Sequence, residues 1–81
     1  MSLQDSDINV QAINIEPTVL IDETSTTEYY VGISRSFSDV NQPNWKIKRI
    51  YKNGNVWYSQ FPKGDQSFNF IWTSRYGYTY S

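Results

Sequence analysis

The chain has 81 residues, a formal net charge of −1, and no cysteine or histidine. This length allows one small domain, and the missing residue types exclude disulfides, thiolate zinc sites and the usual general base near neutral pH. No apolar run approaches the roughly 20 residues of a membrane-spanning helix, and the acidic start MSLQDSD lacks the features of a signal peptide. We therefore expect synthesis in the cytoplasm and no membrane association.

The N-terminal part of the chain predicts a polar arm followed by strands. Residues 1–7 are polar, and we expect an arm there that orders only against a partner, followed by a single β domain at 8–81. Alternating apolar residues predict a strand within 8–15, with a change of phase at Ile13. Thr18–Asp22 and Thr26–Ser34 predict two more strands, with ETST between them as a turn. Residues 35–44 predict an exposed loop.

A β-hairpin is predicted around Asn53-Gly54. A type I′ turn needs positive φ at both central positions, which Asn and Gly tolerate best. Tyr51 then faces Val56, and Arg49 faces Tyr58. The predicted core surface carries Trp45, Ile47, Arg49, Tyr51, Val56 and Tyr58, and the opposite surface carries Lys46, Lys48, Ile50, Lys52, Trp57 and Phe61.

Aromatic residues dominate the C-terminal tail. After a turn at residues 62–65, two trios alternate with other residues and predict further strands, the last of them in YGYTYS: Phe68, Phe70 and Trp72, then Tyr76, Tyr78 and Tyr80. The expected fold is all-β, a small antiparallel sandwich or barrel of about five to seven strands. Most of these rings are predicted to pack in the core or sheet, and an interface with another subunit and sugar stacking are the alternatives.

Charge is divided between the two halves of the chain. Residues 1–44 hold seven acids and one base, whereas residues 45–81 hold six bases and one acid. One interpretation places acidic strands beside a basic hairpin within the domain. The other is that the asymmetry orients contacts between copies or with a larger charged assembly.

No catalytic, metal-binding or cofactor-binding group stands out, so we expect a protein that is not an enzyme. Lysines around Trp57 suggest a platform for single-stranded nucleic acid, but a sequence pI of about 5.1 makes this unlikely. The candidates for packing are Trp45, Ile47, Arg49, Tyr51, Val56, Tyr58, Phe68 and Trp72. The candidates for partner contacts are Trp57, Phe70, Tyr76, Tyr78, Tyr80, Arg35 and Phe37.

One further pattern covers residues 29–81. It consists of Tyr29-Tyr30-Val31-Gly32, then Trp45-x-Ile47-x-Arg49-Ile50, then Gly64-Asp65-x-x-Phe68-x-x-x-Trp72-x-x-Arg75, and a closing Thr79-Tyr80-Ser81. This order resembles small uncharacterised proteins encoded among the structural genes of tailed bacteriophages. Thr73 stands where those proteins commonly have Asp, so the acidic neighbour of Arg75 is missing here.

The resemblance implies a virion component, made in the host cytoplasm and present in many copies. Its expected partners are itself, as a ring or trimer, and larger virion proteins of the capsid surface, neck or tail. Two alternatives stay open. One is a receptor- or glycan-binding module of a tail fibre or baseplate, which would use Trp57 and the tyrosine row. The other is a single-stranded nucleic-acid-binding barrel, which would use Lys46, Lys48 and Lys52.

Overall fold

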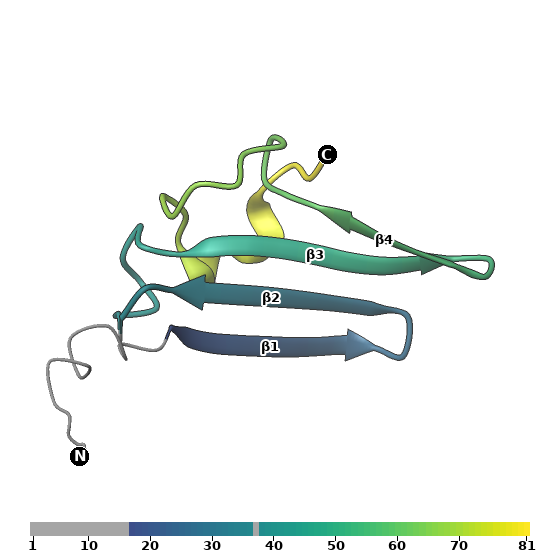
Figure 1. Ribbon diagram of the computed structural model, residues 1–81, viewed down its shortest axis with the longest axis horizontal. Helices are drawn as coiled ribbons and strands as arrows, with labels where there is room; N and C mark the ends of the chain where they lie inside the picture. Colours follow the sequence, from purple (N-terminus) through teal and green to yellow (C-terminus); the bar gives the residue numbers. More distant parts are fainter. Residues whose placement is uncertain (1–16, 37) are drawn as a thin grey trace, which may run out of the picture.

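The computed structural model describes residues 17–36 and 38–81 of the chain. In them, four strands form one antiparallel sheet in which each strand pairs with its neighbour in sequence (Figure 1). The strands are β1 (Thr18–Ser25), β2 (Glu28–Ser34), β3 (Lys46–Asn53) and β4 (Val56–Gln60). The expected all-β character is confirmed.

The sheet is smaller than the sequence predicts. Within the described residues it is single and open, with four strands instead of the about five to seven of a sandwich or barrel. The reason lies in the C-terminal tail, where residues Trp72–Gly77 form a 3₁₀ helix. The ladder contacts of this tail are two isolated bridges, Trp45 with Phe70 and Pro62 with Tyr80, and the Thr73 amide also donates to the Val40 carbonyl at 3.1 Å. The predicted arm at 1–7 and the predicted strand within 8–15 lie outside the described residues.

The hairpin between β3 and β4 turns one residue later than predicted. Asn53 pairs with Val56, so the turn residues are Gly54 and Asn55. Gly54 has a φ of 65°, while neither Asn53 nor Asn55 has positive φ, so the prediction of a type I′ turn at Asn53-Gly54 is wrong. Tyr51 faces Tyr58 instead of Val56. Side chains alternate between faces with a period of two, and the partner is shifted by two residues along β4. The side chains of β3 and β4 therefore keep their predicted faces.

The turn between β1 and β2 also differs from the prediction. β1 continues through Ser25, and the chain reverses at Thr26 and Thr27, so the turn at ETST is wrong. Short hydroxyl side chains support the reversal: the Thr24 hydroxyl donates to the Glu28 carbonyl at 3.1 Å, and the Thr27 amide donates to the Ser25 hydroxyl at 3.1 Å. Side chains of this type bond nearby backbone and so favour turns.

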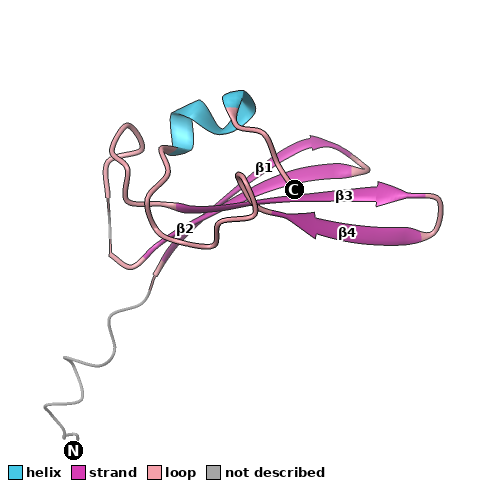
Figure 2. Cartoon of the chain, turned by 90° about the horizontal axis from the view of Figure 1, so that it is seen from above, coloured by secondary structure: helices cyan, strands magenta, loops and turns pink. Residues whose placement is uncertain are grey.

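One face of the sheet is covered by the chain that follows β4 (Figure 2). Tyr30, Trp45 and Ile47 from the sheet region form a core with Phe70 and Trp72 from the C-terminal segment. Trp45 and Ile47 are 1% and 0% exposed. The Trp45 indole donates to the Asp39 carbonyl at 3.0 Å, which satisfies its buried N–H. Burial of these large side chains is the main stabilising contribution to this two-layer arrangement.

The core face is not covered over its whole length. The β3–β4 hairpin projects beyond the C-terminal layer (Figure 2), so Val56 and Tyr58, predicted to pack in the core, are 50% and 43% exposed. Tyr51 stacks on Tyr58 with 5.3 Å between ring centroids. Arg49, also on this face, donates to a Glu28 carboxylate oxygen at 2.7 Å. This part of the core face is therefore held by stacking and an ion pair at the surface.

Candidate functional site

The face of the sheet that points away from the 3₁₀ helix (Figure 2) includes exposed apolar side chains, among them Ile21 at 66% exposed. Side chains along a strand alternate between the two faces of the sheet, so this face carries the strand residues that lie between the core-facing ones. We call this surface the open face. Its members are Val19, Ile21, Glu23, Tyr29, Val31, Ile33, Lys46, Lys48, Ile50, Lys52, Trp57 and Ser59.

An apolar strip occupies the β1 and β2 half of the open face. The pairing of β1 with β2 sets Val19 opposite Ile33 and Ile21 opposite Val31. Val19 is 51% exposed and Ile21 is 66% exposed. Cross-strand pairs of β-branched residues stabilise a sheet best when a second layer covers them. A strip of this kind is typical of a surface that another polypeptide covers.

A row of lysines follows the strip on β3. Lys46, Lys48 and Lys52 share the open face with one acid, Glu23, so its net charge is +2. At the hairpin end, the Lys52 ammonium lies 5.8 Å from the centroid of the Trp57 ring, and Trp57 contacts Tyr29 edge-on at 5.9 Å. The open face therefore combines an apolar half with a cationic half.

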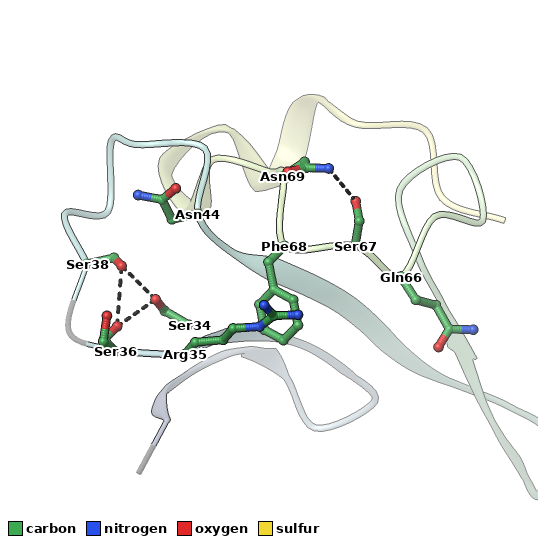
Figure 3. A pocket seen from close by; sticks show the side chains of 9 residues that line it. All are labelled: Ser34, Arg35, Ser36, Ser38, Asn44, Gln66, Ser67, Phe68 and Asn69. Atoms are coloured by element: carbon green, nitrogen blue, oxygen red, sulfur yellow. Dashed lines mark hydrogen bonds between the residues drawn. The ribbon is translucent and has the colours of Figure 1, made fainter. Parts of the chain in front are cut away.

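A polar pocket lies at the end of the sheet near the start of β3 (Figure 3). It has a volume of about 590 Å³ and is lined by residues 66–69 and by Ser34, Arg35, Ser36, Ser38 and Asn44. The Arg35 guanidinium lies 4.3 Å from the centroid of the Phe68 ring. The Ser34 and Ser38 hydroxyls are 2.7 Å apart, and the Ser34 hydroxyl donates to the Ser36 carbonyl at 2.6 Å. These hydroxyls are thus engaged with the loop itself.

On the covered face, Arg75 fastens the 3₁₀ helix to β1. Its Nε donates to an Asp22 carboxylate oxygen at 2.9 Å, and one terminal nitrogen donates to the Trp72 carbonyl at 3.1 Å. The Tyr76 hydroxyl donates to the same Asp22 oxygen. The guanidinium also stacks on the Trp72 ring at 4.4 Å. Asp22 from β1 therefore supplies the acidic partner that Thr73 does not.

The Asp22 site predicts a pH dependence of stability. The hydrogen bond from Tyr76 and the charge of Arg75 lower the pKa of Asp22 below its ordinary value of 3.8. A lowered folded-state pKa stabilises the fold above the unfolded-state pKa, and this contribution is lost as the pH falls through the folded-state pKa. We therefore expect the free energy of unfolding to fall below about pH 4. Asp22→Asn should lose about 1.5–3 kcal/mol at neutral pH and flatten this decline.

Denaturant titrations at several pH values measure both effects. Glu23→Gln is the matched control, because Glu23 is the next residue of β1 but is exposed on the open face. It should leave the neutral-pH stability within about 0.5 kcal/mol of the starting protein. Equal losses for the two variants would contradict the role given to Asp22.

The structure separates the residues predicted to contact partners. Trp57 is 47% exposed on the open face, whereas Tyr76 is exposed on the covered side, in edge-on contact with Tyr30. Arg35 is exposed at the polar pocket, and Phe37 lies outside the described residues. The residues predicted to contact partners therefore do not form one continuous surface.

The prediction that Phe70 contacts a partner is wrong. Phe70 is buried in the core, because its backbone pairs with Trp45 in both directions at 2.9 Å and draws the ring inward. Tyr78 and Tyr80 are half-buried and contact the same core. The Ile71 amide donates to the Tyr78 hydroxyl at 2.9 Å, and the Tyr80 hydroxyl donates to the Arg75 carbonyl at 2.7 Å. These two tyrosines join parts of the C-terminal layer to each other.

Sequence reasoning missed the apolar strip and Asp22. The alternation in TVLID contained a signal for the strip, since Val19 and Ile21 share one face while Leu20 and Asp22 share the other. Both sides of β1 thus carry apolar residues, which is typical of a strand covered on both faces. No local pattern connects Asp22 with Arg75, because the two residues are 53 positions apart.

Comparisons with protein families, with curated proteins and with solved structures find no family model, no relative and no structure that matches this chain. Within the described residues, no helix has the length and apolar character to cross a membrane.

Proposed function

We propose that this chain is a non-enzymatic structural protein of a bacteriophage virion, present in many copies, which joins or decorates larger virion proteins of the capsid surface, neck or tail. The observation that supports an assembly role best is the open face, where Val19 and Ile21 stand in an apolar strip without cover from the described residues. The virion setting comes from the resemblance carried by residues 29–81.

Covering the open face would complete the two-sheet architecture that the sequence predicts. Stacked sheets lie about 10 Å apart and bury the facing side chains of both. A small domain buries a modest fraction of its surface alone, so a neighbour on this face adds stability by mass action. The fold and the assembly would then depend on each other, as in proteins built into repeated shells or tubes.

The glycan-binding alternative loses support from the positions of its residues. Tyr29 and Tyr30 are successive residues of β2 and lie on opposite faces of the sheet. Trp57 contacts the Tyr29 ring, whereas Tyr76 contacts the Tyr30 ring. Trp57 and the tyrosine row therefore lie on different sides of the sheet. A flat sugar platform needs its rings on one side.

Nucleic-acid binding is the second alternative, and three lysines do share the open face with Trp57. The β1–β2 half of the open face, however, carries mostly aliphatic side chains, such as Ile21 and Val31. Single-strand binding surfaces use successive aromatic rings on which bases stack. The aliphatic strip favours a protein partner.

Light scattering on the purified full chain, together with co-sedimentation with purified virion proteins, tests the proposal. We expect self-association or virion binding that Ile21→Asp weakens by about a hundredfold or more, because it would place an unpaired charge in the interface. Val56→Asp is the matched control: Val56 is similarly exposed, but on the opposite face at the hairpin end. A monomeric chain without affinity for virion proteins, or equal effects of the two variants, would overturn the proposal.

A further inference from the structure

We propose that the open face binds residues 1–16 of a neighbouring copy of this chain. This inference rests on the proposed function, because it names the partner that covers the open face in an assembly of many copies. All members of the open face are described residues, whereas residues 1–16 lie outside the described part and are joined to β1 through Pro17.

The chemistry of the two parts is complementary. The open face has three lysines and one glutamate beside its apolar strip. Residues 1–16 contain three acids and no lysine or arginine, namely Asp5, Asp7 and Glu16. They also contain the apolar residues Leu3, Ile8, Val10, Ala12, Ile13 and Ile15. An acidic segment with apolar residues matches a cationic, apolar face both in charge and in apolar composition.

The same charges disfavour the simplest other occupant, a second open face. Two open faces packed fully against each other would bring six lysines together with only two glutamates. Like charges that face each other across an interface are destabilising, and burial increases this cost. A segment that carries acids avoids this repulsion.

Length and direction favour a neighbouring copy over the same chain. Sixteen extended residues reach about 50 Å, roughly twice the about 26 Å spanned by eight residues of a strand. Glu16 precedes Pro17, and a residue before proline is biased toward extended backbone. The sequence therefore disfavours a tight reversal at the start of β1, which the segment would need to return over its own sheet.

A complementation experiment with full-length chains tests this inference. One variant, Ile21→Asp, has a defective face and an intact N-terminal segment. The other, Val10→Asp with Ile13→Asp, has a defective segment and an intact face; it changes one residue from each phase of the alternation. We expect each variant alone to be monomeric where the wild type associates. Their mixture should form a one-to-one complex, with a dissociation constant at least about tenfold below that of either variant alone.

A charge exchange provides a second test that does not place a charge in the apolar strip. Lys48→Glu should weaken association of the wild type, and Asp5→Lys with Asp7→Lys in the same chain should restore it, provided that circular dichroism shows all variants folded. The inference is overturned if the mixture stays monomeric, if the segment variant associates like the wild type, or if the charge exchange gives no recovery. In these cases the proposed function still stands when Ile21→Asp weakens association or virion binding and Val56→Asp does not.

Discussion

Replacing Trp72 with alanine is expected to remove most of the stability of this protein. Trp72 is buried at the centre of the covered face, 6.3 Å from the Trp45 ring between centroids, and carries the stacked Arg75 guanidinium. Removing a buried tryptophan costs about 3–5 kcal/mol. A small domain has a total stability near the lower end of about 5–15 kcal/mol. We expect the melting temperature to fall by at least about 15 °C in a circular dichroism melt.

Trp57→Ala is the matched control for this experiment. The same side chain is removed, but from the open face, where Trp57 is 47% exposed, forms a T-shaped pair with Tyr29 and has the Lys52 ammonium over its ring. The expected loss is about 1 kcal/mol or less, because the ring leaves no cavity. If the two tryptophan variants melted at similar temperatures, the C-terminal layer would not be the main cover of the sheet.

The strands were predictable from sequence because alternation and turn residues are local signals. β3 and β4 show this best: the faces of Ile47 and Lys48 follow from period-two alternation alone. The turn between them was not predictable to the residue, since Asn53-Gly54 and Gly54-Asn55 both offer suitable turn residues. Positive φ at two successive positions occurs instead at Lys63 and Gly64, with φ of 53° and 70°.

The C-terminal layer was not predictable, because its aromatic spacing suits strands as well as the observed structure. Tyr76, Tyr78 and Tyr80 alternate in sequence, but Tyr76 belongs to a 3₁₀ helix and Tyr80 to an isolated bridge. Tertiary contacts decide the outcome. The Tyr80 hydroxyl donates to the Arg75 carbonyl, and the Thr73 hydroxyl donates to the Asn41 side chain at 2.8 Å. The periodicity of a short sequence segment does not indicate which residues of other segments form these hydrogen bonds.

Charge asymmetry was visible in the sequence, and the structure shows part of its use. Both ion pairs among the described residues join an acid of the first half to a base of the second, Glu28 with Arg49 and Asp22 with Arg75. These pairs agree with the interpretation that acidic strands lie beside basic segments within the domain. Neither of these pairs contains a lysine, and three of the four lysines of the chain are on the open face. The asymmetry is thus also available for contacts between copies.

Gly32→Ala is expected to destabilise the protein although it places alanine in a strand. Gly32 lies on the core face of β2, opposite Leu20 and Ile47. A methyl group there would meet the Trp72 ring, with Cζ3 only 2.7 Å away and Cε3 closer still. Alanine normally gains about 0.5–1 kcal/mol over glycine inside a strand. Here the clash should reverse the sign, with a net loss of about 1–3 kcal/mol, because the ring must leave its position between Trp45 and Arg75.

Two further variants isolate the contact between Gly32 and Trp72. Gly77→Ala has open space around the new methyl group and no positive φ, so it should leave the stability unchanged or raise it by up to about 1 kcal/mol. In a Trp72→Leu background the smaller side chain relieves the clash, so adding Gly32→Ala should cost less than it does beside Trp72. Thermal melts of the four chains of this double-mutant cycle measure the coupling, and additive losses would contradict it. A positive coupling would show that the missing side chain at position 32 is what lets the C-terminal layer approach the sheet.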